Sequence, residues 1–194
     1  MSSAIAQLRR EAILSAALSL IETSGAEAVS MANLARCTGL SRPAIYQYFA
    51  SREHVLGEVM MNDMADLSNE IDRLLGPLQD PLEQVRVWMH YSLSHVSGPQ
   101  HQFVREISVE QLPAETRGEL VALHGCFMTS LIAPLNELGV REPASLAHLI
   151  FAAINAAAKR IDAGASFVAE ASVLETFVVA GIEAALATNQ GENT

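Results

Sequence analysis

The stretch from Ser30 to Arg52, SMANLARCTGLSRPAIYQYFASR, constrains the fold of this chain more than any other. It contains two candidate helix starts, because the hydroxyls of Ser30 and Ser41 can each accept a hydrogen bond from an amide of the first turn. Gly39 lies between them and can take the left-handed conformation that ends a helix without steric cost. Pro43 falls in a first turn, where a missing N–H costs nothing. The stretch therefore predicts two short helices joined by a tight turn, a helix-turn-helix.

The second predicted helix, from about Arg42 to Phe49, has side chains suited to reading DNA. In a helix-turn-helix the second helix lies in the major groove, with its N-terminal residues nearest the base edges. Arg can read guanine and Gln adenine through two hydrogen bonds, and a Tyr hydroxyl suits a phosphate. We therefore expect base contacts from Arg42 and Ala44, with Pro43 against a thymine methyl. The residues expected to contact phosphates, flanking bases or the DNA backbone are Ser30, Ala32, Tyr46, Gln47, Tyr48 and Arg52.

An ordinary helical hairpin is the alternative for this stretch. It explains the apolar positions, and we expect Ile45 and Phe49 to lie in the core in either case. It does not explain why Arg42, Gln47 and Arg52 occur together at these positions of the motif. Their positions therefore favour a DNA-binding motif over a plain hairpin.

Residues 30–52 also resemble the DNA-binding signature of the TetR-type transcriptional regulators. The matching parts are Leu34-Ala35, Gly39-Leu40-Ser41, Ile45-Tyr46, Tyr48-Phe49 and Ser51-Arg52. The signature usually ends in Lys, and Arg52 keeps that charge. The resemblance extends loosely back to about Leu8 and, by motif, not beyond about residue 70. It implies a dimer whose body binds a small hydrophobic effector and whose two heads then release a palindromic operator.

The net charge of −10 argues at first against a nucleic-acid partner. Its distribution changes that interpretation, because residues 1–52 hold five Arg against three Glu, whereas residues 53–194 hold seven basic and nineteen acidic residues. A basic head on an acidic body fits a protein that offers DNA one face only. The head has no Lys, so we expect its affinity for phosphates to be modest and sensitive to salt.

Helical spacing of apolar residues continues along the chain, and no sustained alternation or Asn-Gly turn predicts a strand. The sequence therefore predicts an all-α fold with a three-helix N-terminal head and about nine helices in all. Besides the two of the motif, they are expected at about 3–24, 51–75, 80–97, 100–111, 114–138, 143–163 and 170–188. Arg9 and Arg10 in the first helix are expected either to touch the DNA backbone or to form a solvated basic pair.

The domain boundary is expected near residue 52. A DNA-binding domain (1–52) would connect without a flexible linker to an effector-binding and dimerisation domain (53–194), through the long helix that starts there. A rigid connection matters, because a flexible one would not transmit a conformational change from the body to the head.

The helices expected at 143–163 and 170–188 are rich in Ala and apolar on more than one face. A helix that is apolar nearly all round must be covered on both sides, and the core of the chain covers only one. We expect the other side to form a homodimer interface, a four-helix bundle with two helices from each chain. The alternative is a tightly packed monomer core.

Aromatic and long apolar side chains gather in the helices expected between residues 80 and 138, where they would line a ligand pocket with a few polar groups. The candidate ligand-binding residues are Trp88, Met89, Tyr91, Phe103, Ile107, His124, Phe127, Met128 and Leu131. The alternative is that these residues simply fill the core of the body. Sequence alone does not separate the two.

Neither a catalytic motif nor a phosphate-binding Gly loop occurs in the sequence, so no enzyme, metal or cofactor is expected. The six His are expected on the surface or in the core. A metal site built from three of His90, His95, His101 and His124 is the alternative.

Cys37 and Cys126 are far apart, which favours a reducing compartment over a disulfide framework. Both are expected to be small buried or half-buried residues, with redox sensing by Cys37 as the alternative. No uninterrupted apolar run of about eighteen residues and no secretory signal are present, so a cytoplasmic protein without a membrane span is expected.

These observations together predict a dimeric, ligand-responsive, DNA-binding repressor. The alternative from another class is a helical small-molecule-binding protein or enzyme that retains a helix-turn-helix-like hairpin. A regulator that activates, or that acts without an effector, stays open.

Overall fold

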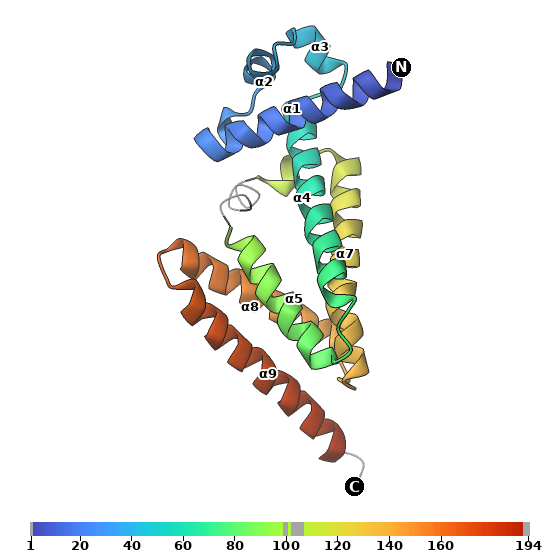
Figure 1. Ribbon diagram of the computed structural model, residues 1–194, viewed down its shortest axis with the longest axis vertical. Helices are drawn as coiled ribbons and strands as arrows, with labels where there is room; N and C mark the ends of the chain where they lie inside the picture. Colours follow the sequence, from blue (N-terminus) through green and yellow to red (C-terminus); the bar gives the residue numbers. More distant parts are fainter. Residues whose placement is uncertain (1, 99–100, 102–106, 192–194) are drawn as a thin grey trace. The chain divides into compact units, whose positions relative to one another are not determined.

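The computed structural model describes residues 2–98, 101 and 107–191, and every regular element among them is helical (Figure 1). This confirms the predicted all-α class. The chain divides into two compact units, a head unit of residues 1–64 and 99–123 and a body unit of residues 65–98 and 124–194. Two long helices, α4 (Arg52–Leu75) and α7 (Ala114–Glu137), each contribute residues to both units.

The other elements of the head unit are α1 (Ser2–Ser24), η1 (Ala26–Ala28), α2 (Met31–Thr38), α3 (Arg42–Tyr46) and η3 (Val109–Gln111). The caps predicted from the sequence are present: Ser30 Oγ accepts from the amide of Asn33 at 3.2 Å, and Ser41 Oγ accepts from that of Ala44 at 3.3 Å. Gly39 ends α2 with φ of 70°, in the left-handed region that favours glycine.

The recognition helix α3 is shorter than predicted, because it ends at Tyr46 and not at Phe49. The amides of Gln47 and Tyr48 bond back to the carbonyls of Ala44 and Ile45, three residues earlier. This tighter spacing turns the chain out of the helix toward α4. The hydroxyl of Ser51 then accepts from the amide of His54 and caps α4.

The described α-helices of the head unit all contribute to one apolar core. Its buried residues include Ile13, Ala17 and Ile21 of α1, Leu34 of α2, Ile45 of α3, Phe49, and Val55, Leu56 and Val59 of α4, together with Ile107, Leu112 and Leu120. The predicted burial of Ile45 and Phe49 is confirmed, since both are 0% exposed. The core fixes the orientation of α3, since one side of that short helix is held in it.

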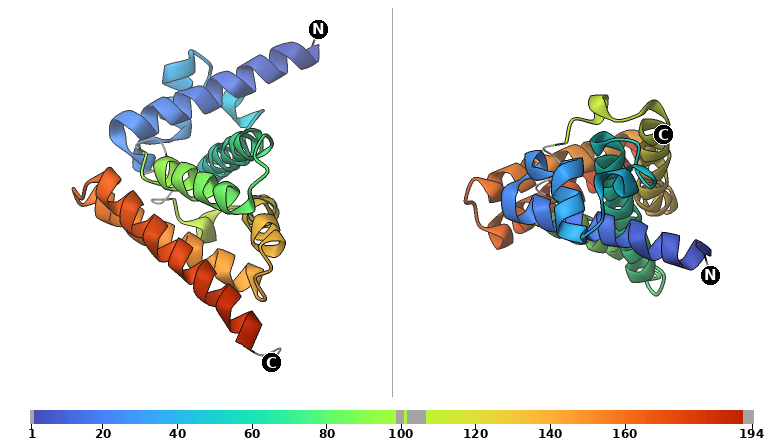
Figure 2. Two further views of the ribbon diagram at one scale, coloured as in Figure 1. Left: turned by 60° about the horizontal axis from the view of Figure 1, so that its bottom comes forward. Right: turned by 90° about the horizontal axis from the view of Figure 1, so that it is seen from above.

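The body unit contains α5 (Pro81–Val96), α8 (Pro143–Asp162) and α9 (Phe167–Gly191), which pack against one another (Figure 2). Asp80 caps α5 by accepting from the amide of Leu82 at 3.1 Å. The last helix extends beyond its predicted range of 170–188 at both ends. Its start is fixed by Ser166, whose carbonyl accepts from the amide of Glu170.

The structure differs from the sequence prediction at the two Cys residues, and it describes only part of the helix predicted at 100–111. Both Cys37 and Cys126 are exposed and not buried, because they lie on the outward sides of α2 and α7. Most of the helix predicted at 100–111 lies outside the described residues, and the part that is described ends in η3.

One described helix, α7, is long and apolar enough to cross a membrane by length and composition alone. Helices of globular cores pass the same test. In the body unit, Phe127, Leu131 and Leu135 of α7 are buried. The absence of a membrane span stays a prediction.

Candidate nucleic-acid interface

The recognition helix presents one exposed face and one buried face. Arg42, Pro43, Tyr46 and Gln47 are exposed, and Tyr46 keeps 49% of its surface. Ile45, between them in sequence, is fully buried. A planar guanidinium, an amide and a phenol therefore share a surface that is free of contacts with the head core, and these groups can donate to base edges and phosphates.

The other candidate DNA-binding residues differ in accessibility. Ala32 is exposed on the first turn of α2, and Ser30 beside it is half-buried because its hydroxyl caps the helix. Ala44 is half-buried on α3. Tyr48 is half-buried as well and packs against the head core. The most accessible part of the predicted interface therefore lies at Arg42, Pro43, Tyr46 and Gln47.

Arg52 makes several contacts within the head unit. Its Nε donates to the carbonyl of Val29 at 2.9 Å, and one terminal nitrogen donates to the carbonyl of Ala26 at 3.0 Å and to Glu27 at 3.1 Å. The guanidinium thus binds two carbonyls of the connection between α1 and α2, and the carbonyl of Ala26 also accepts from the amide of Val29. A phosphate contact by Arg52 would compete with these bonds.

Arg10 is half-buried and bonded within the head unit. One of its terminal nitrogens donates to the carbonyl of Tyr48 at 3.0 Å, and the other donates to the carboxylate of Glu58. Its guanidinium lies over the ring of Phe49, 4.6 Å from the centroid. Sequence reasoning missed Glu58 entirely, because the two charges lie 48 positions apart and no local spacing relates them. Arg9, next to Arg10, is exposed.

The candidate ligand-binding residues of the body unit lie mainly in its core. Trp88, Met89, Phe127, Met128 and Leu131 are all at most 3% exposed. The rings of Trp88 and Phe127 are 4.7 Å apart, and the indole Nε1 donates to Ser130 Oγ at 2.9 Å. In this conformation these side chains pack against one another, as the core alternative describes.

The remaining candidates fall in different places. His124 is half-buried beside Phe127 and Phe151, and this burial, with a smaller effect of His148, lowers the pKa of His124. Ile107 belongs to the head core. Phe103 lies outside the described residues.

Two grooves open on the body unit. The first, of about 660 Å³, runs between α5 and α9 and is lined by Glu83, Arg86, Val87, His90, Tyr91, Ser94, Phe167 and Glu175. Within it the carboxylate of Glu175 lies 3.2 Å from Arg86 Nε and 3.0 Å from His90 Nε2. The second, of about 360 Å³, lies between α8 and α9 and is largely apolar. Among the candidate ligand-binding residues, Tyr91 lines the first groove.

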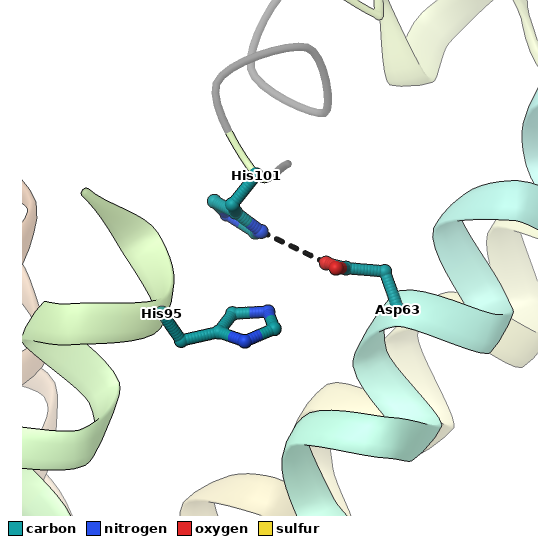
Figure 3. A group of neighbouring side chains, drawn as sticks. All are labelled: Asp63, His95 and His101. Carbon is teal, nitrogen blue, oxygen red and sulfur yellow. Dashed lines mark hydrogen bonds and ion pairs between the residues drawn. The ribbon is translucent and has the colours of Figure 1, made fainter. Parts of the chain in front are cut away.

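Of the His considered for a metal site, His101 pairs with Asp63 of α4 in the head unit. The ring Nδ1 and the carboxylate are 2.8 Å apart, and both side chains are mostly buried (Figure 3). The third side chain that Figure 3 labels, His95, belongs to the body unit.

Residues 13–59, from within α1 to the second turn of α4, match the model of the family described as "Bacterial regulatory proteins, tetR family". The match includes the whole helix-turn-helix with its exposed α3 face. The chain belongs to the tetR family.

This tetR-family chain has relatives among curated proteins. It is 34% identical over 87 residues to the nucleoid occlusion factor SlmA of Vibrio campbellii, a match that covers 44% of each protein. It is 32% identical over 139 residues to the HTH-type transcriptional regulator BetI of Agrobacterium fabrum, covering 68% of this chain and 65% of BetI. The chain thus matches less than two thirds of the length of either relative.

In fold, the tetR-family chain is similar to the transcriptional regulator FadR from Bacillus subtilis, whose crystal structure contains stearoyl-CoA. The TM-score is 0.72 at 17% identity, over 88% of this chain and 98% of FadR. At this identity the similarity shows a shared fold.

Proposed function

We propose that this tetR-family protein is a DNA-binding transcriptional regulator, a cytoplasmic repressor whose α3 reads the major groove of its operator. The proposal is carried by the observation that one side of α3 is exposed and the opposite side is buried in the head core. Arg42, Tyr46 and Gln47 are exposed while Ile45 is fully buried, so the polar face is held rigidly and away from the head core. A rigid polar helix face of this composition suits base readout. The regulator BetI, a relative by sequence, supports the same assignment.

The repressor is proposed to act as a homodimer through α8 and α9. Large apolar side chains stay exposed on these helices, including Leu149 at 64%, Val173 at 68% and Phe177 at 60%. Val173 and Phe177 line the groove between α8 and α9 together with small residues such as Ala153 and Ala156. Such a surface favours close helix packing against a second copy, and an exposed apolar patch is costly unless it is covered.

Selection of random duplex DNA on the purified protein, at two salt concentrations, tests the DNA-binding proposal. Because two identical heads would be related by two-fold symmetry, we expect the selected sequence to be palindromic, with half-sites about 10–10.5 base pairs apart or a multiple of that. Enrichment should weaken with salt, because phosphate neutralisation releases counterions. Absence of any enriched sequence at low salt would overturn the proposal and favour the alternative of a small-molecule-binding protein or enzyme.

The effector is proposed to be a small hydrophobic molecule with a polar end, bound by the body unit. The groove between α5 and α9 has a volume within the usual range of ligand pockets, about 300–1,000 Å³. Val87, Tyr91 and Phe167 offer apolar contacts. An anionic group of the effector would compete with Glu175 for Arg86 and His90. The stearoyl-CoA named with FadR, a protein of similar fold, makes fatty acyl compounds the first probes.

Titration of the DNA complex with stearoyl-CoA, and with free coenzyme A as the control, tests this assignment. We expect the acyl compound alone to release DNA, because an effector shifts an equilibrium only if it prefers one conformation. A Val87→Trp variant, which places a bulky side chain in the groove, should bind DNA normally and resist release. Equal release of the variant and the wild type would place the effector elsewhere.

Enzymatic activity is not part of the proposal. The BetI relative is named as a transcriptional regulator, and the exposed α3 face needs DNA rather than a turnover reaction to account for it. Turnover of the acyl probe by the wild-type protein would contradict this view.

A further inference from the structure

We propose that Arg10 is a positioning residue that holds the recognition helix at the orientation its operator requires, by bracing the turn behind α3 against Glu58 of α4. The inference rests on the proposed DNA-binding function and adds a residue that no DNA contact would reveal. All groups involved lie in the head unit.

The bracing begins at the end of α3. The carbonyl of Tyr48, two residues beyond the end of α3, accepts from Arg10 at 3.0 Å. A positive charge at a helix C-terminus is favourable, because the helix dipole is negative there. The exposed face of α3 ends at Gln47, one residue before this bond, so a shift of the Tyr48 carbonyl moves the reading face as well.

The second contact fixes the guanidinium against α4. Its other terminal nitrogen donates to Glu58, and the Arg10 and Glu58 side chains retain 31% and 16% of their exposure. His54, one turn earlier on α4, lies 3.7 Å from the same carboxylate. An Arg fork that makes two charge-assisted or carbonyl bonds in different directions gives orientation as well as attraction. The side chain thus connects α1, the turn after α3 and α4.

The third contact is with Phe49, whose ring is fully buried and faces the guanidinium at 4.6 Å. The edge of His54 packs on the same ring, at 5.5 Å between centroids. Cation–π contacts are strongest where water is excluded. Phe49 therefore favours the position of the guanidinium in the head unit over one in solvent, and a phosphate would compete with these contacts.

Arg9 provides a matched control. It carries the same charge on the same helix, one residue away, but it is exposed. Arg9→Gln and Arg10→Gln change the net charge equally, so any difference between the two variants reports on the contacts of Arg10 and not on the charge of the head.

The test measures binding of the full-length variants to the selected operator and to a scrambled duplex over a series of salt concentrations. Arg10→Gln should lose about tenfold in operator affinity or more, the size expected for a lost charged hydrogen bond. It should bind the scrambled duplex as Arg9→Gln does, and it should keep the wild-type salt slope. A direct phosphate ligand would instead lower the slope by about 0.9. That lower slope, or an operator loss no larger than that of Arg9→Gln, would overturn the inference.

A merely structural role would lower the fraction of folded protein and so reduce both affinities equally, leaving their ratio unchanged. Arg10→Lys and Glu58→Gln keep the test decisive if Arg10→Gln folds poorly. Lys retains the charge but does not donate in two fixed directions. Compared with Arg10→Gln, Arg10→Lys should therefore recover more of the free energy of unfolding than of the ratio between operator and scrambled-duplex affinities.

Hydrogen exchange of the amides of residues 44–49 in the absence of DNA tests the bracing role of Arg10 separately from the DNA-binding proposal. Faster exchange in Arg10→Gln than in Arg9→Gln supports the brace even if no operator is found, in which case the DNA-binding proposal alone fails. Equal exchange in the two variants overturns the brace.

Discussion

At the scale of single residues, Gly57 and Thr116 show how tightly the head unit is packed. A Cβ built on Gly57 would lie 2.5 Å from the Cγ2 methyl of Thr116. Thr116 is 5% exposed and its branched side chain is stiff, so the methyl cannot simply rotate away. Gly57 is therefore required by the close approach of α4 and α7 in this unit and not by backbone conformation.

Gly57→Ala should consequently destabilise the protein. Overpacking costs about 1–3 kcal/mol, while the better helix propensity of Ala returns about 1 kcal/mol, so we expect a net loss of about 1 kcal/mol in the free energy of unfolding by urea. In the Thr116→Ser background the methyl is absent, and the same substitution should become neutral or stabilising. An equal loss in both backgrounds would show that the contact is not the cause.

His124 predicts a dependence of stability on pH. Burial, and secondly His148, lowers the pKa of His124 from its ordinary value of 6.5 in the folded state. Between the two pKa values the unfolded chain binds more protons, so stability rises with pH. The contribution of neutral His124 is therefore fully present above pH 6.5 and is lost as the pH falls through the folded pKa.

Urea unfolding at about pH 7.5 and about pH 5 should show a smaller loss of stability for His124→Gln than for the wild type. The variant removes the titrating group but keeps a polar side chain of similar reach. An identical pH dependence in the two proteins would mean that His124 is not the group responsible.

Residue-level prediction from sequence succeeded where the cause was local and failed where it was not. The cap at Ser41 and the left-handed Gly39 depend on neighbouring residues, and both were predictable. The contacts of Arg10 with Tyr48 and Glu58 depend on how three helices meet, so the sequence left Arg10 as a phosphate ligand or a solvated charge. The same limit applies to Arg52, which contacts carbonyls more than twenty positions away.

At the scale of elements, the starts of α2 and α3 at Ser30 and Ser41 were the most predictable feature, and the end of α3 and both ends of α9 were the least. Ser, Asp and Pro at a helix start act within one turn. The end of α3 depends on Phe49, which has to reach the head core, so the chain leaves the helix before that residue. The ligand-site prediction failed to distinguish pocket from core for a similar reason, because apolar composition is the same in both.

Ser41→Ala tests the element scale directly. Loss of this cap should cost about 1 kcal/mol of stability, measured by urea unfolding, and it should increase exchange of the α3 amides. Ser19→Ala, at an exposed position inside α1, is the control and should be neutral or slightly stabilising, because Ala favours helix interiors. Equal effects of the two substitutions would contradict the role of the cap.

At the scale of the whole molecule, the proposed recognition of a palindromic operator requires two copies of the chain. Phe177→Glu places a charge on the exposed apolar surface of α9 and should convert the proposed dimer to a monomer in sedimentation experiments, because a charge buried without a partner is costly. Val121→Glu, at a position that is 73% exposed in the head unit, introduces the same charge elsewhere and should leave the dimer intact. Dimers of both variants, or monomers of both, would contradict an interface on α8 and α9.

The central claim is that α3 of this tetR-family protein reads a specific DNA sequence. It is tested most directly by the operator affinity of Arg42→Ala relative to a scrambled duplex. Arg73→Ala, at an exposed position of α4 in the body unit, is the control for the lost charge. We expect Arg42→Ala to lose about 1–3 kcal/mol of discrimination at one base pair of each half-site and Arg73→Ala to lose none. An unchanged preference in Arg42→Ala would contradict the claim.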